Sequence, residues 1–200
     1  ENWTMNESLP LNRTQAIELL KSMNQEESNM NHYLESEAIM KKLAERFGMN
    51  VNYWGMLGLL HDVDWADTKD NWAEHTIKAE EILKEKGFDE DFIQIIQSHG
   101  YGYVEIPIHK EKERKEKVEN SLAAAETLTG LIYAYALMRG GKISDMESKG
   151  LKKKFKDKSF AANCDREIIL EIEKTGLELS EFLELAIDAM KGIKDEIGLN

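Results

Sequence analysis

The scarcity of proline constrains the fold of this chain more than any other feature. Only two prolines, Pro10 and Pro107, occur in 200 residues. Because proline breaks helix interiors, the long proline-free stretches that remain are typical of a mostly helical chain. Apolar residues recur at helical spacing almost throughout, with no convincing two-residue alternation. We therefore expect an all-α fold.

The composition supports one well-buried domain, since 42% of the residues are hydrophobic and single domains commonly reach roughly 200 residues. We expect a flexible leader at residues 1–13, a helical domain at 14–145 and a helical C-terminal extension at 146–200, packed on the same domain. Ser180 is the expected N-cap of the last helix. The expected helices span residues 14–23, 28–47, 52–61, 71–86, 89–99, 111–139, 165–175 and 180–197.

The charge balance argues against two classes of partner. Twenty-six Lys and Arg residues against 38 Asp and Glu residues give a formal net charge of −12. Nonspecific binding to nucleic acid or to an anionic membrane needs clustered positive charge, so we expect neither. The longest apolar run, residues 121–138, is marginal in length for a membrane span and contains Glu126. We assign this run to the protein core.

Cysteine usage predicts a cytoplasmic protein. The single cysteine, Cys164, cannot form an internal disulfide, which fits a reducing compartment. No apolar run near the start resembles a signal peptide. Because no histidine or second cysteine neighbours it in sequence, we expect Cys164 to be a structural thiol.

The histidines carry the strongest chemical signal. His32, His61, His75 and His99 each lie on, or at the end of, the apolar face of an expected helix, whereas His109 is expected at the surface. A single inward histidine is more often a packed core residue than a ligand, but four with the neighbouring acid Asp62 are harder to explain by packing. Neutral imidazoles and carboxylates together are the ligands of zinc, iron or manganese.

A lone acid strengthens the case for a metal site. Glu126 falls in the apolar stripe of the expected helix at 111–139. A buried carboxylate costs several kcal/mol unless it is paired, protonated or bound to a metal.

These residues, in this order, resemble the HD-domain superfamily of metal-dependent phosphohydrolases. The phrase Gly58-Leu59-Leu60-His61-Asp62-Val63-Asp64 is similar to the signature of the family, and His32 lies 29 residues upstream. The tail at 152–162 is similar to a stretch found in one bacterial branch. The resemblance covers roughly residues 14–166 and implies an HD-like helical bundle.

The resemblance implies one or two divalent transition metal ions, of which Mn, Fe, Zn, Ni and Co are not distinguished. The first ion would be bound by His32, His61, Asp62 and Glu126, and the second by His75 and His99, with Asp62 as a bridge. Two departures stand out: Glu126 replaces the usual aspartate, and Gly100 follows His99 where members with two metals often have a second histidine.

The implied activity is the hydrolysis of a small-molecule phosphomonoester or phosphodiester, with a nucleotide as one candidate. Asp62 would act at the metal, and Asp64 would orient or deprotonate the attacking water. The acidic chain needs local positive charge to handle phosphate, so the basic run supplies candidate substrate contacts. These are Lys152, Lys153, Lys156 and Lys158, and two loop tyrosines, Tyr101 and Tyr103, could stack on a base.

Two other functions stay open. Some proteins of this fold hold a di-iron centre that activates oxygen, which two bound irons and an oxygen-dependent reaction would reveal. A noncatalytic module, degraded at Glu126, would bind a ligand or a partner helix and would hydrolyse no phosphate ester with any divalent metal.

Overall fold

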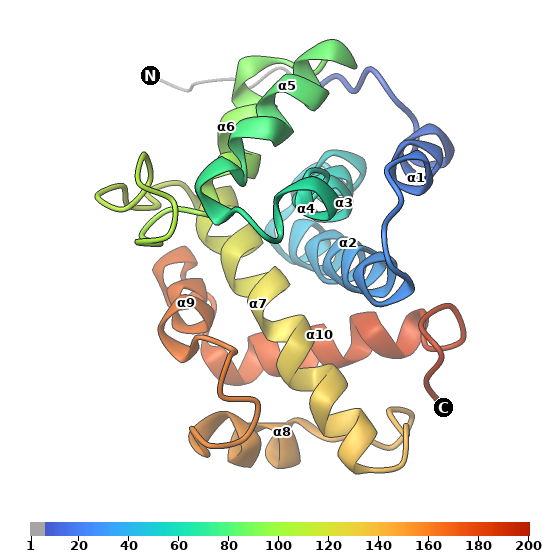
Figure 1. The fold of residues 1–200 in the computed structure, drawn as a ribbon. Coiled ribbons are helices and arrows are strands. Elements are labelled where there is room, and N and C mark those ends of the chain that lie inside the picture. The colour runs from blue at the N-terminus through green and yellow to red at the C-terminus, as the bar shows by residue number, and fades with distance from the viewer. Residues whose placement is uncertain (1–6) are drawn as a thin grey trace.

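The computed structural model describes residues 7–200, and every regular element in this range is helical. The all-α prediction is thus confirmed for the described chain, while residues 1–6 of the predicted leader lie outside it. Figure 1 shows the helices arranged as a bundle. They are α1 (Arg13–Ser22), α2 (Glu27–Phe47), α3 (Val51–Leu60), α4 (Trp65–Thr68), α5 (Ile77–Glu85), α6 (Glu90–Ser98), α7 (Lys117–Met138), α8 (Ser148–Lys156), α9 (Arg166–Leu170) and α10 (Leu179–Gly192), with 3₁₀ turns η1 (Trp72–Glu74) and η2 (Glu171–Thr175).

The boundaries of α2 and α3 follow from local residue chemistry. Gly48 ends α2 with φ of 66°, a left-handed conformation that glycine adopts without a steric penalty. Asn50 then caps α3, because its side chain accepts a hydrogen bond from the backbone N–H of Tyr53. The tight turn between the caps places the two helices against each other.

Helices α2 and α3 pack against each other with two glycines of α3 facing α2. A Cβ at Gly58 would lie 2.6 Å from the backbone oxygen of Ser36 in α2. A Cβ at Gly55 would meet only a side chain, at 2.7 Å from Cε of Lys41. The absence of a side chain at Gly58 therefore lets the two backbones approach, and this approach fixes His32 on α2 relative to His61 after α3.

Helix α7 runs through the centre of the bundle and packs against α2, α9 and η2 (Figure 1). It is long and apolar enough to cross a membrane by length and composition, but 56% of its apolar window is buried within the protein. Its inner side chains, among them Leu122, Leu128 and Ile132, are fully buried. The assignment of this run to the core is confirmed for its inner face, while Leu137 and Met138 at its end are exposed.

The predicted helix at 71–86 is wrong in its first half. The segment folds as η1 and then α5, with His75 in extended conformation and Thr76 at φ of 70° between them. A left-handed β-branched residue is unfavourable, so the break must be held from outside. The carboxylate of Asp64 does this by accepting hydrogen bonds from the N–H groups of Thr76 (2.7 Å) and Ala79 (3.1 Å).

Three further expectations are corrected. Residues 111–116 are not helical, and α7 begins at Lys117, where Glu116 and Glu119 form a capping box. The basic run contains a helix, α8, that the sequence reading missed. The N-cap of α10 is Glu178 rather than Ser180, and this helix ends at Gly192 instead of residue 197.

Candidate metal centre

Two groups of side chains that could hold a metal ion lie next to each other in the bundle. His32 from α2, His61 from the end of α3 and Glu126 from α7 form one group; Asp62, His75 and His99 form the other. In each group the candidate ligand atoms lie within 4.8 Å of one another. The structure thus brings together all six side chains that the sequence reading named as ligands.

In the first group, the Nε2 atoms of His32 and His61 face each other at 3.0 Å. His61 must carry its proton on Nδ1, because this atom lies 2.7 Å from the carbonyl oxygen of Gly58, which can only accept. His32 Nδ1 donates to Oγ1 of Thr129 at 2.8 Å, since that hydroxyl itself donates to the carbonyl of Glu126. Two imidazole lone pairs therefore point at each other, which requires a proton or a metal cation between them.

The second group repeats the arrangement. The Nε2 atoms of His75 and His99 face each other at 3.1 Å. His99 Nδ1 donates to the carbonyl of Ile96 at 2.5 Å, and His75 Nδ1 donates to Oδ1 of Asp64 at 2.9 Å. Backbone or carboxylate acceptors that fix the tautomer of a histidine in this way are typical of metal-ligating imidazoles.

Asp62 lies between the two pairs and offers one oxygen to each. Its Oδ2 is 3.4 Å from Nε2 of His61 and 3.7 Å from Nε2 of His32. Its Oδ1 is 3.1 Å from Nε2 of His99 and 3.4 Å from Nε2 of His75. Each of the two groups could therefore hold a metal ion, with Asp62 between them.

Both departures from the family pattern have a structural explanation. Glu126 reaches the first group with its longer side chain: its Oε2 is 3.8 Å from Nε2 of His32, and its Oε1 accepts a hydrogen bond from the hydroxyl of Thr127. At Gly100 a Cβ would lie 3.0 Å from Cδ1 of Ile106 and 3.2 Å from Cγ2 of Thr76. A side chain at this position would therefore require these two methyl groups to give way by a few tenths of an ångström.

Burial and neighbouring charge shift the pKa values of these groups in different directions. Burial lowers the pKa of His32 to about 3, helped by His61. Burial also opposes a charge on His75, but hydrogen bonds with Asp62 and Asp64 outweigh it and raise its pKa to about 10. For Asp62 the nearby His61 overcomes burial and holds the pKa well below its usual range, whereas burial raises the pKa of Glu126.

A small cavity of about 120 Å³ opens over the second group. Asp62, His75, His99 and Glu126 line it, as do aromatic side chains that surround them. Trp65 packs its ring edge-on to Trp72 at 5.3 Å between centroids, and Trp72 lies 6.0 Å from the ring of Tyr103. Trp72 is 39% exposed, so an aromatic surface meets solvent beside the candidate metal ligands. The sequence reading named Tyr103 but missed both tryptophans.

Asp64 does not occupy the position expected of a residue that orients or deprotonates water. Its side chain is fully buried, and its two oxygens accept hydrogen bonds from His75 and from the backbone of Thr76 and Ala79. It is absent from the lining of the cavity. Asp64 is therefore a positioning residue that orients His75 and caps α5.

His109 is buried, so the expectation that it lies at the surface is wrong. Its Nε2 hydrogen-bonds Oγ1 of Thr76 at 2.7 Å, and burial together with Lys112 lowers its pKa to about 4. The neutral ring thus binds the side chain of Thr76, while Asp64 binds its backbone N–H. No sequence signal pointed to this contact, which joins residues 33 positions apart.

Arg114 is a second residue that sequence reasoning missed. Its guanidinium donates to the carbonyls of Ser98 and Tyr101 at 2.9 Å and forms a two-point ion pair with Glu171, the shorter contact measuring 2.6 Å. Only 8% of the residue is exposed. This cation ties the segment that carries His99 to η2.

The other predicted substrate contacts lie away from the cavity. Tyr101 packs on His109 at 5.0 Å between centroids and does not line the cavity. Lys152, Lys153 and Lys156 belong to α8, which Figure 1 shows at the far end of α7, and Lys158 follows that helix. The ammonium of Lys152 donates to Oγ of Ser180. Among the described residues that line the cavity there is no Lys or Arg.

Cys164 is half-buried, and burial raises the pKa of its thiol, which suits a structural role rather than a nucleophile. Its Sγ would lie 3.0 Å from a Cβ at Gly130 of α7. The cytoplasmic location that we inferred from this lone cysteine stays a prediction.

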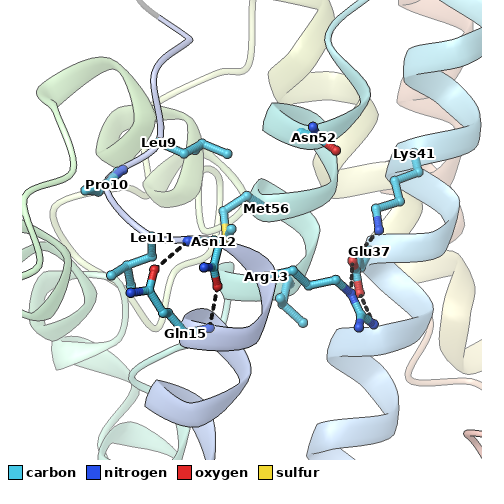
Figure 2. A pocket seen from close by; sticks show the side chains of 11 residues that line it. Leu9, Pro10, Leu11, Asn12, Arg13, Gln15, Glu37, Lys41, Asn52 and Met56 are labelled. Atoms are coloured by element: carbon cyan, nitrogen blue, oxygen red, sulfur yellow. Dashed lines mark hydrogen bonds and ion pairs between the residues drawn. The ribbon is translucent and has the colours of Figure 1, made fainter.

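A larger cavity, of about 500 Å³, lies between the segment before α1 and the α2–α3 pair (Figure 2). Its charged residues neutralise one another, because Glu37 is bound by the guanidinium of Arg13 at 2.7 Å and by the ammonium of Lys41. None of the candidate metal ligands lines this cavity, whereas four of the six line the smaller one.

Comparison with known families agrees with the geometry. The family model of the HD domain matches residues 29–129, which span the candidate ligands from His32 to Glu126. The chain belongs to the HD-domain family, a family of metal-dependent phosphohydrolases.

The chain is also similar to curated proteins named ribonuclease Y. Those from Thermotoga petrophila, Thermotoga sp. strain RQ2 and Thermotoga maritima are each 29% identical over 180 residues, covering 84% of this chain and 32% of the relative. The chain thus spans about a third of the length of these relatives. No solved structure matches it significantly.

Proposed function

We propose that this protein hydrolyses a phosphodiester by means of two adjacent divalent metal ions. The observation that carries the proposal is the pair of opposed imidazoles on each side of Asp62, with Nε2 separations of 3.0 and 3.1 Å. Each of the four Nδ1 atoms is already engaged as a donor, so each Nε2 lone pair is directed to a cation.

Bound divalent ions would supply Lewis acidity, which lowers the pKa of a coordinated water and offsets charge on the phosphoryl oxygens. The protein holds the candidate ligands in fixed positions. Asp62 directs one oxygen to each imidazole pair, and Asp64 and Arg114 hold the segments that carry His75 and His99. The candidate ligands Asp62, His75, His99 and Glu126 line the cavity. The aromatic side chains beside them limit the access of bulk water.

The choice of a diester rests on the relatives named ribonuclease Y, since their name describes cleavage of RNA, a phosphodiester polymer. Within residues 7–200 the cavity lining includes the acids Asp62 and Glu126 but no Lys or Arg. The positive charge that receives the phosphoryl group would therefore come from the bound ions.

The size of the cavity indicates which part of the substrate it accepts. About 120 Å³ is well below the roughly 300–1,000 Å³ of pockets that enclose a whole organic ligand. The scissile phosphoryl group fits, and the remainder of the substrate extends past Trp72 and Tyr103 to solvent.

The test is to load purified protein with Mn²⁺, Zn²⁺, Fe²⁺, Ni²⁺ or Co²⁺ and to measure metal content and hydrolysis together. We expect two ions per chain, turnover of bis(p-nitrophenyl) phosphate, and slower turnover of p-nitrophenyl phosphate. Asp62→Ala should lose both metal and activity. Equal inactivity of wild type and Asp62→Ala under every metal would favour a noncatalytic module. Two tightly bound irons with oxygen consumption would favour an oxygenase.

A further inference from the structure

Helix α8 presents a row of lysines to solvent. Lys149, Lys153 and Lys156 are exposed and occur at spacings of four and three residues, which places them on one face of the helix. Along the axis they are separated by about 6 Å and about 4.5 Å. Lys158 is exposed just beyond the helix. We call the row Lys149–Lys153–Lys156 the lysine stripe.

The lysine stripe is unpaired, whereas several other lysines of the molecule form ion pairs. Lys78 pairs with Glu74 at 3.0 Å and Lys84 pairs with Glu80. By contrast, the structure of residues 7–200 shows no ion pair or side-chain hydrogen bond for any of the three stripe lysines. Three unpaired cations in a row on one helix face can together bind an anion from outside the chain.

Internal contacts hold the stripe in place. Leu151 and Phe155 anchor α8 in the core, and Lys152 bonds Ser180 of α10. The guanidinium of Arg166 donates to six carbonyl oxygens around the end of α8, which fixes the following loop. These carbonyls belong to Lys154, Phe155, Asp157, Phe160, Ala161 and Cys164.

The stripe is connected to the cavity by α7 and by the loop after α8. Gly150 of α8 lies against the hydroxyl of Tyr135, which is nine residues, or about 14 Å of helix, from Glu126. The loop returns from α8 to Cys164, beside Gly130 of α7. Helix α7 therefore links the helix that carries the stripe to Glu126 in the cavity lining.

We propose that the lysine stripe binds the phosphate backbone of single-stranded nucleic acid. Its spacing is of the same order as the rise per nucleotide of about 3.4 Å in a stacked strand, and lysine is a donor without base preference. A basic helix that binds membranes also presents apolar side chains, whereas Leu151 and Phe155 of α8 face inward. Although the net charge of −12 disfavours nonspecific binding overall, the stripe provides positive charge locally.

The test measures binding without hydrolysis. A fluorescent 12-nucleotide single-stranded RNA is titrated with the full chain in a chelator, and anisotropy is followed at several salt concentrations. If the three lysines each contact one phosphate, the stripe should contribute about −2 to the slope of log affinity against log salt concentration. Affinity should then fall about 20-fold between 50 and 200 mM salt from these contacts alone.

The decisive comparison uses two triple variants of equal charge. Lys149→Gln, Lys153→Gln and Lys156→Gln together should remove the stripe contribution and lower affinity at 50 mM salt at least tenfold. The control changes Lys78, Lys84 and Lys86 to Gln; these lysines belong to the α5 segment, at the opposite end of the bundle (Figure 1), and are ion-paired. The control should bind RNA as wild type does, and thermal unfolding checks that both variants fold.

Three results would overturn the inference: no RNA binding by wild type, equal weakening in both variants, or preferential binding of phosphatidylserine vesicles. The vesicle arm is needed because Leu137 and Met138, at the end of α7, are exposed by 56% and 55%. Because the assay contains a chelator, a failure of phosphodiester hydrolysis leaves its outcome unaffected.

Discussion

Replacement of Gly58 by alanine tests the link between helix packing and the candidate metal centre. The new Cβ would lie 2.6 Å from Ser36 O, 2.7 Å from Ser36 C and 2.8 Å from Glu37 N. All three are backbone atoms of α2, so no flexible side chain can move aside. The closest contact is about 0.8 Å short of the 3.4 Å at which ordinary van der Waals contact begins. Helices α2 and α3 must therefore separate by several tenths of an ångström.

The magnitude follows from two opposed effects. Overpacking typically costs about 1–3 kcal/mol, and a rigid backbone neighbour favours the upper end of this range. Alanine recovers about 1 kcal/mol of helix propensity relative to glycine. The net loss in unfolding free energy is then about 2 kcal/mol, or about 4–8 °C in Tm for a chain of this size.

Separation of the helices also displaces His61 from His32, because His61 follows α3 and bonds the carbonyl of Gly58 itself. Metal affinity at the first group should fall about 10–100-fold, the usual cost of disturbing groups that orient a ligand. Denaturant unfolding and calorimetric titration with Mn²⁺ or Zn²⁺ measure the two effects.

Gly55→Ala is the matched control. Its Cβ meets only the flexible side chain of Lys41, at 2.7 Å from Cε, and this chain can move. Stability should be unchanged or slightly higher, and metal affinity should be retained. If Gly58→Ala were as stable as wild type and bound metal equally well, the close packing of α2 on α3 would not determine the geometry of the site.

Three further substitutions have expected outcomes. Asp64→Asn removes the acceptor of His75 and should lower occupancy of the second metal about 10–100-fold while the first is kept; full occupancy of both would contradict the positioning role. Glu35, whose pKa burial raises to about 8, contributes stability that is present below the unfolded pKa and is lost as pH rises toward 8. Relative to wild type, Glu35→Gln should therefore raise the free energy of unfolding more at pH 8 than at pH 4.5, by on the order of 3 kcal/mol. Denaturant unfolding of both proteins across this pH range measures the difference, and equal pH profiles would refute the reasoning. Trp72→Ala should raise KM for a nucleotide diester about 5–100-fold, as loss of base stacking predicts, with kcat retained; an unchanged KM would exclude stacking.

The sequence was sufficient to name the six candidate ligands because it resembles a known family. The order of His32, the His61-Asp62 pair and a later acid is similar to the family pattern, although that acid is Glu126 rather than the usual aspartate. The structure brings these side chains together from segments that are distant in sequence.

What could not be predicted depends on contacts between distant segments. The break at Thr76 exists because Asp64 binds its backbone N–H and His109 binds its side chain, and neither contact has a periodic signal. The role of Arg114 requires knowledge that Glu171 lies beside the His99 segment. The helical periodicity of residues 71–86 therefore predicted a continuous helix, whereas tertiary hydrogen bonds stabilise a break within it.

Metal binding between the opposed imidazoles exchanges one cation for another: the metal ion replaces the proton that each pair retains. Two imidazole lone pairs that face each other need a cation between them, so each pair favours a retained proton when no metal is bound. The raised pKa of His61, for which Asp62 overcomes burial, and that of His75, raised to about 10, agree with this. A divalent ion must displace that proton. Loading should therefore acidify a weakly buffered solution, its measured enthalpy should vary with the ionisation heat of the buffer, and acidic conditions should empty the centre.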